Sequence, residues 1–578
     1  MGTSESYHLW EKIDLEFTSL TAYENPYTEV VVWVDLIGPG FSKRVYGFWN
    51  GGSTFVVRVL AIAAGQWHWT SGSNQDDAGL NGHSGRFNAI AWHDAGLVEN
   101  PNRRGMIQTT PDGRGLQYAD GTPFFLLGDT WWSVPTWRFP LREDDELRPI
   151  GPDAGLNEYV QLRKAQGFNC VGIMAALPNW ANDGHPRRLF TEDGTVLRAA
   201  WTTPGTNFAM DMHNEGGRAF EFPGKAPGYE EVFPDVDRIN PDYFKVLDKK
   251  IDYLNAQGFV PFLEAARRDS GQAWKKYYDW PDSYTRYVQY VFARYQANIM
   301  ILSPIHYDHF GETIAAREYN AACNAVVDRF GQPPFGTLQS ANCSPSTLVN
   351  FGDPKECRWL TAHQIGNARE HYTYWYLTEI YHSEPPRPAF NGEPYYSGLS
   401  LHGEYPLAVE GDSEQDRDYV RSSLYGSFLS GGFAGYIYGC EGIWQADVEP
   451  GANVPMWDAF QYKSATEVQH VKAFATVQGN RYLTLIPNAE LLVPNKSGTW
   501  HGFYGWSYCA HSPERDWFML YFEKGCEVTR LRGAVVGQRF QPTWFDPRTG
   551  QWGEPGEAIE VGTNSLLDLP SPQDDQDW

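Results

Sequence analysis

The chain has 578 residues, 42% of them apolar, which is enough for two or three domains with cores of their own and argues against disorder. No apolar run is long enough to span a bilayer, so we expect no membrane partner. The net charge is −25, from 71 acidic and 46 basic residues without a basic stripe. This balance argues against a nucleic-acid partner and disfavours a strongly anionic polysaccharide, and it does not indicate the oligomeric state.

Aromatic side chains are abundant, with 23 Trp, 33 Tyr and 32 Phe making up 15% of the chain. Sugar rings present flat C–H faces that stack on such side chains, so the total favours a carbohydrate-binding protein. For any single tryptophan, core filling is the simpler interpretation.

The seven cysteines form no Cys-x-x-Cys pair and no Cys/His cluster, so we expect no metal and no cofactor. An odd number of scattered thiols favours a reducing compartment. The opening residues lack a basic segment followed by an apolar one, so no signal peptide is expected. A cytoplasmic location is favoured, and a secreted or periplasmic one stays open if a signal has been removed.

The first part of the chain is predicted to be a β-sandwich over residues 1–104. Val30–Leu36 and Thr54–Ile62 are rich in β-branched residues and are bounded by turn residues. No helical period appears before about residue 150.

Residues 105–480 are predicted to form a (β/α)8 TIM barrel, so the fold class is α/β. Short apolar runs alternate there with amphipathic segments, and such alternation implies parallel strands. The helix-like segments include Leu156–Ala165, Tyr243–Gln257, Ser283–Ala297 and Asp416–Leu429. The eight predicted strands are Phe124–Leu127, Phe168–Met174, Phe259–Leu263, Asn298–Leu302, Phe335–Gln339, Trp359–Ala362, Pro388–Asn391 and Gly435–Tyr438.

One stretch interrupts this alternation. Pro178–Pro241 is rich in Gly, Pro and Asn and is too long for an ordinary connection, so we interpret it as a functional loop over the barrel mouth. A mouth closed on one side favours an exo-acting enzyme.

A second β-sandwich is predicted for residues 481–578. Trp517–Phe522, Arg539–Phe545 and Ala558–Val561 alternate with turn residues. The acidic tail Pro570–Trp578 is expected to fray.

Glu393 is the best catalytic candidate. In Arg387-Pro-Ala-Phe-Asn-Gly-Glu393-Pro-Tyr-Tyr396 it follows the seventh strand, and the active site of a barrel lies at the carboxyl ends of its strands. Glycoside hydrolysis needs two carboxylates, one as proton donor and one as nucleophile or base. The alternative is a surface or ion-paired glutamate in a turn.

The second carboxylate is expected after the fourth strand, where Asp308 and Glu312 compete. Asp308 lies closer to the strand end and is flanked by His306, Tyr307 and His309, so we prefer it as the acid/base. For both acids the alternative is stabilisation of a helix N-terminus, which involves no catalysis.

Further residues follow other strand ends and are predicted to bind substrate. Asp129 is placed for hydrogen bonds to sugar hydroxyls, although it also suits a core-capping role, and Trp131 or Trp132 suits a stacking platform. His402 and Glu404 suggest a subsite. The full predicted set is Asp129, Trp131, Trp132, Asn179, Glu264, Arg267, His306, His363, Tyr395, His402, Glu441 and Trp444.

These segments resemble a known family. Gly121-Thr-Pro-Phe-Phe-Leu-Leu-Gly-Asp129-Thr-Trp-Trp resembles the opening strand of the apiosidase-like glycoside hydrolases, family 140 and its relatives, and Asn-Gly-Glu393-Pro resembles their nucleophile strand. Phe55-Val-Val-Arg with Gly65-Gln-Trp-His-Trp is similar to the sandwich placed before that barrel. Trp544-Phe-Asp-Pro-Arg-Thr-Gly550 is similar to a terminal sandwich labelled as collagen-binding.

The resemblance implies a retaining glycoside hydrolase with carboxylates after strands four and seven. Members commonly carry an acid directly at the end of strand four, whereas Asp308 is displaced by about two residues. We expect cleavage of a plant, algal or microbial glycan, with the sugar, linkage and anomer unspecified. The alternatives are a non-catalytic carbohydrate-binding protein on a barrel scaffold and a polysaccharide lyase that uses His306, Tyr307 and His309.

Overall fold

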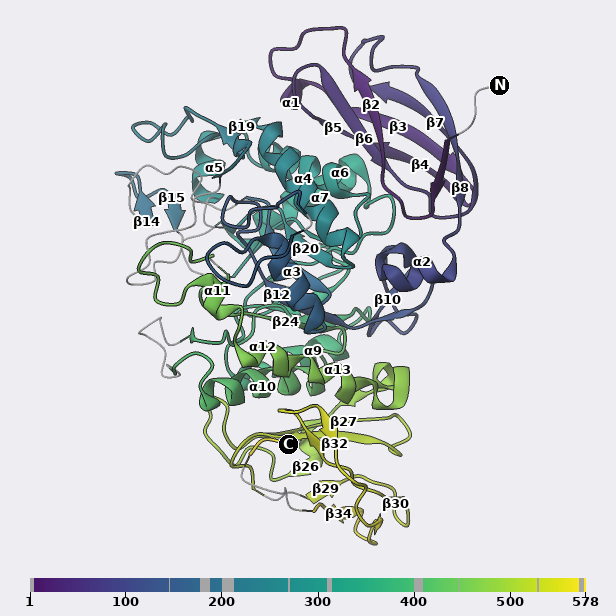
Figure 1. The fold of residues 1–578 in the computed structure, drawn as a ribbon, viewed down its shortest axis with the longest axis vertical. Helices are drawn as coiled ribbons and strands as arrows, with labels where there is room; N and C mark the ends of the chain where they lie inside the picture. Colours follow the sequence, from purple (N-terminus) through teal and green to yellow (C-terminus); the bar gives the residue numbers. More distant parts are fainter. Residues whose placement is uncertain are drawn as a thin grey trace.

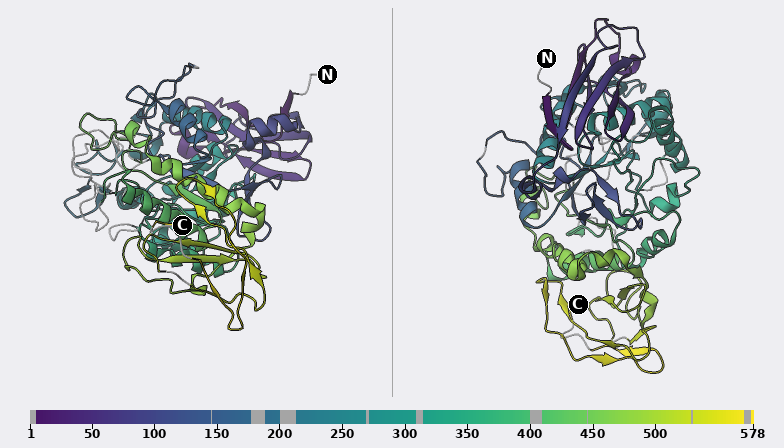
Figure 2. Two further views of the ribbon diagram at one scale, coloured as in Figure 1. Left: turned by 60° about the horizontal axis from the view of Figure 1, so that its bottom comes forward. Right: turned by 90° about the vertical axis from the view of Figure 1, so that its right-hand side faces the viewer.

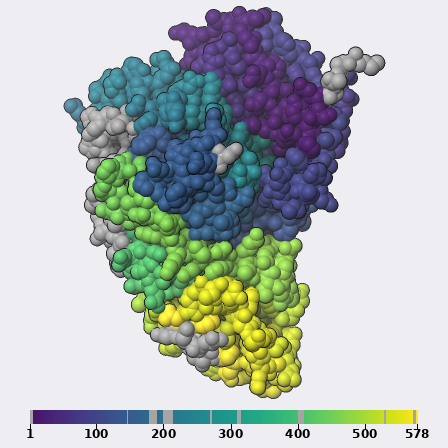
Figure 3. Space-filling model, viewed as in Figure 1, coloured from purple at the N-terminus to yellow at the C-terminus, as the bar shows by residue number. Residues whose placement is uncertain are grey.

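The computed structural model has a β-rich part at each end and a barrel between them (Figure 1). Figure 3 shows these parts as one continuous body. The structure describes residues 5–144, 146–176, 188–199, 213–268, 271–308, 314–399, 409–444, 446–527, 530–570 and 576–578.

Two sheets form the N-terminal part. One has the order β1-β8-β7-β3-β4 and the other the order β2-β6-β5. Along β3 the side chains of Val32, Val34 and Leu36 are buried and alternate with more exposed ones, as a strand with one buried face requires. The strand bounds are β1 Glu5–His8, β2 Ile13–Thr18, β3 Val32–Gly38, β4 Phe41–Tyr46, β5 Phe48–Trp49, β6 Thr54–Val59, β7 Gly65–Ser73 and β8 Ser84–Ile90.

This N-terminal part is joined to the barrel by a buried arginine. Arg58 of β6 binds Asp248 of α4 (Pro241–Ala256) at 2.6 Å and donates to the carbonyl of Arg294 in α6 (Asp282–Tyr295) at 2.7 Å. Arg294 binds the same carboxylate of Asp248 at 2.7 Å. Arg58 also pairs with Asp14 at 3.2 Å, so two arginines and two carboxylates compensate one another where the sandwich meets two barrel helices.

The barrel contains one seven-stranded sheet of parallel strands, in the order β21-β20-β13-β12-β24-β23-β22. The predicted fifth strand, Phe335–Gln339, contributes one isolated bridge, between Gln339 and Leu302, and Cys343, which follows it by four residues, pairs with Tyr307. Ala362 also donates to Gln339, which connects this segment to the sixth strand. The predicted barrel fold is confirmed, with strand bounds β12 Leu126–Thr130, β13 Cys170–Met174, β20 Val260–Glu264, β21 Ile301–Ser303, β22 His363–Ile365, β23 Ala389–Asn391 and β24 Gly435–Tyr438.

Helices surround these strands (Figure 2, right). Two of them begin at clear sequence signals: Asn240 and Ser413 accept hydrogen bonds from the backbone in the first turns of α4 and α10. No helix among the described residues is long and apolar enough to cross a bilayer. The principal remaining bounds are α3 Leu156–Ala165, α5 Gly271–Tyr277, α7 Ala316–Phe330, α9 Trp375–His382, α10 Glu414–Leu429, α12 Lys463–Val468 and α13 His470–Ala475.

Where it is described, the long interruption, which the sequence predicted to be a functional loop over the barrel mouth, contains short paired strands. Residues 177–187 and 200–212 lie outside the described part. The pairs are β14 Arg188–Phe190 with β15 Val196–Ala199, β16 His213–Asn214 with β17 Gly217–Arg218, and β18 Phe220–Glu221 with β19 Asp235–Ile239.

The C-terminal part consists of small sheets. Tyr425 of α10 stacks on Tyr521 of β28, so this part packs on a barrel helix. The predicted boundaries at residues 104/105 and 480/481 stay predictions. The strands are β25 Ile486–Pro487, β26 Leu492–Val493, β27 Ser507–His511, β28 Phe518–Phe522, β29 Arg530–Arg532, β30 Arg539–Phe540, β31 Phe545–Asp546, β32 Gln551–Trp552, β33 Ile559–Glu560 and β34 Leu566–Asp568.

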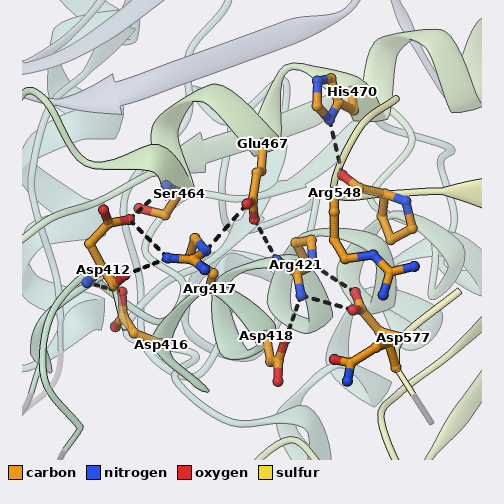
Figure 4. Close-up of polar contacts among 12 residues, drawn as sticks. Asp412, Asp416, Arg417, Asp418, Arg421, Ser464, Glu467, His470, Arg548 and Asp577 are labelled. Atoms are coloured by element: carbon orange, nitrogen blue, oxygen red, sulfur yellow. Dashed lines mark hydrogen bonds and ion pairs between the residues drawn. The ribbon is translucent and has the colours of Figure 1, made fainter. Parts of the chain in front are cut away.

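An ion-pair network ties the last described residues to the barrel (Figure 4). Arg421 of α10 binds both carboxylate oxygens of Asp577 at 2.8 Å and also pairs with Asp418 and Glu467. Asp577 is buried, and the backbone of Trp578 pairs with that of Phe522. The expectation of a frayed tail is therefore wrong for residues 576–578, because a buried arginine supplies a partner that the local sequence does not reveal.

Candidate active site

A pocket lies at the carboxyl ends of the barrel strands, where a barrel places its chemistry. Its wall combines carboxylates, arginines and aromatic rings that come from several strand ends. The lining residues are Trp132, Arg267, Asp308, Asn367, Arg369, Glu393, Tyr396, Leu399, Glu441 and Trp444.

Glu393 is held as a buried carboxylate by three side chains. Arg369 donates to Oε1 at 3.0 Å, Asn342 donates to Oε2 at 3.1 Å, and the hydroxyl of Tyr396 lies 3.5 Å from Oε1. Glycine is required at position 392, directly before Glu393, because a Cβ there would lie 1.8 Å from Oε1 of Gln364. The Asn-Gly turn therefore places the Glu393 carboxylate where Arg369 and Asn342 donate to it.

Asp308 is also buried, and cations surround it. Arg267 binds Oδ2 at 3.0 Å, Arg268 lies 3.2 Å from Oδ1, and Nε2 of His306 lies 3.3 Å from Oδ1. Burial alone would raise the pKa of Asp308, but Arg267, Arg268 and His306 outweigh it and hold that pKa well below its usual range. Asp308 is therefore a carboxylate in the free protein.

His306 connects Asp308 to a third carboxylate. Its Nδ1 lies 2.6 Å from Oε2 of Glu264, the last residue of β20. Burial lowers the pKa of His306, but Glu264 and Asp308 raise it to about 10. Burial raises the pKa of Glu264. The imidazole, which lies between Glu264 and Asp308, is thus a cation at neutral pH.

Three groups meet closely at the centre of the site. A ring nitrogen of His306 and carboxylate oxygens of Asp308 and Glu393 all lie within 4.8 Å of one another. Spacing of this kind suits a metal ion, but the chemistry of this donor set does not. The imidazole is protonated, and Arg267 and Arg369 already neutralise the two carboxylates, so these residues are a poor fit for a divalent cation.

Aromatic rings form the rest of the wall. Trp132 lies edge-on to both His306 and Trp444, with ring centroids 5.0 and 5.5 Å apart. The indole of Trp444 donates to Glu441 at 3.0 Å, and Arg369 stacks over the ring of Tyr396. Apolar ring faces beside carboxylates suit a sugar ring, which needs both stacking and hydrogen bonds.

Six of the predicted residues come together in this wall: Glu393, Asp308, Trp132, Arg267, Glu441 and Trp444. Glu264 and His306 are not among the lining residues. His306 contacts Asp308, which lines the pocket, and Glu264 contacts His306.

Asp129 and Trp131 belong to the core and do not line the pocket. Asp129 accepts from Arg163 at 2.6 Å and from the indole of Trp131 at 2.8 Å, and both residues are wholly buried. Trp131 packs against Phe139 and Phe460. Their side chains therefore hold the first strand end against α3 rather than facing the pocket.

His363 and Tyr395 are likewise buried away from the pocket. Nδ1 of His363 lies 2.8 Å from the hydroxyl of Thr347, and burial lowers the pKa of His363 to about 3, so it is neutral. Tyr395 donates to Asp416 at 2.8 Å. The other candidates, Asn179, His309, Glu312, His402 and Glu404, lie outside the described residues.

Sequence reasoning missed several groups of the site, namely Arg268, Asn342, Asn367, Arg369 and Leu399. Asn367 and Arg369 follow the sixth strand by two and four residues, so a wider search past each strand end would have found them. Asn367 adopts a φ of 52°, a left-handed conformation that asparagine tolerates, and its side chain accepts from Arg369. No sequence signal marks Asn342, because its strand pairs only through isolated bridges.

A larger cavity of about 590 Å³ lies in the C-terminal part, away from these carboxylates. Its lining is mostly aromatic and aliphatic, and it includes the rings of Trp517, Phe540 and Trp544. Among its lining residues Asp516 is the single carboxylate, so this cavity offers no carboxylate pair for hydrolysis.

Comparisons with known families match most of the chain. Residues 110–479 match the model described as "Apiosidase-like, catalytic domain". Residues 6–74 match a domain of unknown function, and residues 493–578 match a "Putative collagen-binding domain of a collagenase". A comparison with curated protein sequences gives no match.

Solved structures share the fold at low sequence identity. A Bacteroides vulgatus protein described as a "putative glycoside hydrolase" is 15% identical, with a TM-score of 0.64 over 98% of each chain. A family 5 glycoside hydrolase from the same species is 16% identical, with a TM-score of 0.57 over 82% of this chain and 92% of that one. A third structure, described as "Glycoside hydrolase", is 16% identical, with a TM-score of 0.57 over 83% and 96%.

Proposed function

We propose that this chain, which belongs to the apiosidase-like family and is a glycoside hydrolase, cleaves its substrate by double displacement with retention of the anomeric configuration. The observation that carries the proposal is the approach of the Asp308 and Glu393 carboxylates to within 4.8 Å. Retaining enzymes hold their two carboxyl groups about 5–5.5 Å apart, whereas inverting enzymes leave about 6.5–9.5 Å for a water molecule. Oxygen atoms of the two carboxylates that lie within 4.8 Å of each other support the retaining arrangement.

Glu393 is the proposed nucleophile. A nucleophile must be ionised and correctly directed, and Arg369 and Asn342 bind its two oxygens separately. Attack on the anomeric carbon forms a covalent glycosyl-enzyme, and water then cleaves the new bond.

Asp308 is the proposed acid/base, because it is the carboxylate opposite Glu393. It protonates the leaving oxygen in the first step and deprotonates water in the second. Its arginine partners favour the ionised form, so the first proton must come to Asp308 from a neighbouring group.

The proposed substrate is a neutral glycan of plant, algal or microbial origin. The family name supports testing apiosides first, and the aromatic wall around Trp132 and Trp444 supports a stacked sugar ring. Exo action remains part of the proposal and rests on the long insertion before α4. The arginines described at the site pair with Asp308 and Glu393, so they do not form the separate uronate-binding group that a lyase needs beside its base.

The test is a glycan-panel assay of the wild type, Glu393→Gln and Asp308→Asn, with apiosides, pentosides and hexosides in the panel. The proposal expects sugar release by the wild type and a loss of several orders of magnitude in Glu393→Gln. Release of single sugars supports exo action, whereas mixed oligomers support endo action. Sugar binding without cleavage of any panel member would instead support a carbohydrate-binding protein. An active Asp308→Asn variant would remove Asp308 from the acid/base role and direct attention to Glu312.

A further inference from the structure

Behind the acid/base candidate lies an ordered chain of three ionisable side chains. Glu264 contacts Nδ1 of His306 at 2.6 Å, and Nε2 of the same ring lies 3.3 Å from Asp308. All three side chains are buried, so no bulk water separates them. Nδ1 of His306 is hydrogen-bonded to Glu264, whereas Nε2 lies in ion-pair range of Asp308 without forming a hydrogen bond. Transfer of a proton from Nε2 to Asp308 therefore requires these two groups to move closer.

The histidine is fixed in place by its backbone and by one ring contact. His306 donates from its backbone amide to Ala266 at 2.8 Å, and Arg268 donates to the carbonyl of His306 at 3.2 Å. Its ring meets Trp132 edge to face, with centroids 5.0 Å apart. Because the backbone and the ring are both held, the imidazole cannot turn away from Asp308 without disturbing two strand ends.

We propose that His306 is a positioning residue that stores the catalytic proton for Asp308, and that Glu264 keeps the proton on the ring until substrate binds. This inference rests on the proposed function and extends it by naming where the proton resides. The family resemblance does not supply it, because the histidine belongs to the segment in which this chain departs from the family pattern.

The charges around the ring support this role. Glu264 from β20 and Asp308 lie beside its two nitrogens. Glu393, from the end of β23, has a carboxylate oxygen within 4.8 Å of a ring nitrogen. Arg267 and Arg268 pair with the carboxylate oxygens of Asp308. Carboxylates thus contact the imidazole directly, while the arginines contact the carboxylate of Asp308. This arrangement stabilises a charged ring beside an ionised Asp308, so one proton is available to the pair and resides on the histidine.

The proton balance of the reaction is complete without another reactant. In the first step the Nε2–H bond of His306 breaks and an O–H bond forms on Asp308, which passes this proton to the leaving oxygen as Glu393 bonds to the anomeric carbon. In the second step water attacks that carbon, the bond to Glu393 breaks, and the water proton returns through Asp308 to His306. No oxidation occurs, and the net reaction is hydrolysis.

The first test needs no substrate. In protein labelled with ¹⁵N-histidine, the ring nitrogens of His306, assigned by their absence from His306→Gln, are followed from pH 6 to 11. The proposal expects both nitrogens to stay protonated at pH 7 and to titrate near pH 10, and it expects the titration of Glu264→Gln at lower pH. A neutral His306 at pH 7 would overturn the proposal whether or not the chain is a retaining hydrolase.

The second test separates proton supply from folding. It compares the wild type and His306→Gln on 4-nitrophenyl glycosides, whose leaving group needs little acid help, and on alkyl glycosides of the same sugar. General acid catalysis contributes about 10²–10⁴-fold, so His306→Gln should lose at least about 100-fold on alkyl glycosides and much less on nitrophenyl glycosides. An equal loss on both substrates would indicate a merely structural role and overturn the proposal.

His371→Gln is the matched control. His371 is also buried beside a carboxylate, with Nδ1 3.0 Å from Glu523, but it lies where the barrel meets the C-terminal part. We expect it to keep the wild-type ratio between the two leaving groups and the wild-type pH profile. In His306→Gln the remaining alkyl-glycosidase activity should shift to acid pH, where solvent protonates Asp308 directly. An unshifted profile would contradict the relay.

Discussion

The carboxylates of Asp308 and Glu393 approach to within 4.8 Å, although 84 residues separate them in the chain and different strands carry them. Each carboxylate has its own cationic partners, Arg267 and Arg268 on one side and Arg369 on the other. Two like charges can remain this close because arginines compensate both of them. The arginines therefore stabilise the close approach of the two carboxylates at the barrel mouth.

Removal of Arg369 should reduce catalysis, and it should also reduce stability because Glu393 is buried beside it. Arg369 donates to Glu393 at 3.0 Å and also holds Asn367 and the carbonyl of Pro394. Arg369→Gln removes a charged donor from the proposed nucleophile, and a loss of about 10²–10³-fold in kcat/KM is expected by analogy with loss of an active-site donor. Thermal unfolding of the same variant measures its stability. Wild-type kcat/KM in a folded Arg369→Gln variant would contradict the role given to this contact.

Asp129→Asn should reduce stability rather than substrate affinity. The substitution leaves Arg163 buried without its carboxylate partner, which typically costs about 3–5 kcal/mol. Chemical denaturation gives the free energy of unfolding, and the KM of the folded enzyme gives substrate binding. If KM rises strongly while stability is unchanged, the sequence prediction of a sugar contact at Asp129 is correct and the core role is wrong.

The network around Arg421 should couple the C-terminal part to the barrel. Arg421→Met leaves the buried Asp577 without its cation and Asp418 with Lys524 alone, so we expect a loss of about 3–5 kcal/mol in the free energy of unfolding. A double-mutant cycle with Asp577→Asn measures the coupling, which should exceed about 1 kcal/mol for two groups in direct contact. Additive effects of the two substitutions would show that the contact does not join the two parts.

Lys250 should make stability depend on pH. Its ammonium is buried and donates to the carbonyls of Val134 and Thr136 at 2.9 and 2.7 Å, and burial lowers its pKa from 10.5 to about 7. Between pH 7 and 10.5 the unfolded chain binds more protons at this residue than the folded one, so its contribution to stability rises with pH, by up to about 1.4 kcal/mol per unit. Urea denaturation of the wild type and Lys250→Met at pH 7, 8 and 9 isolates this effect. A constant difference between the two proteins would contradict it.

The fold was largely predictable because most barrel strands lie in short apolar runs, although β22 begins at His363, just after the predicted sixth run Trp359–Ala362. The run Phe168–Met174 contains β13, and Pro388–Asn391 contains β23. Parallel strands that are buried on both faces are apolar throughout, so a continuous apolar run is enough to locate them. The fifth strand was placed correctly in order, but within Phe335–Gln339 only Gln339 forms a bridge, to Leu302. The strands within Pro178–Pro241 were not predicted, because strands of two to five residues are too short to show a clear periodic pattern.

The site was predictable only as far as chain position determines it. Glu393 and Asp308 could be named because they follow strand ends, but their partners Arg369 and Asn342 come from other strands. Asp129 also follows a strand end, yet it binds Arg163 of α3, a contact between residues that are 34 positions apart. The position of an acid after a strand end therefore identifies the candidates for the barrel mouth. Contacts with residues of other strands and helices determine which of these candidates line the pocket.

The most direct test of the central claim is the anomeric configuration of the first product. The wild type is mixed with the best glycoside from the panel, and ¹H NMR spectra are recorded before the free sugar mutarotates. The close pair of Asp308 and Glu393 predicts that the initial product has the same anomeric configuration as the substrate. An initial product of the opposite configuration would contradict the double displacement and the role of Glu393 as nucleophile.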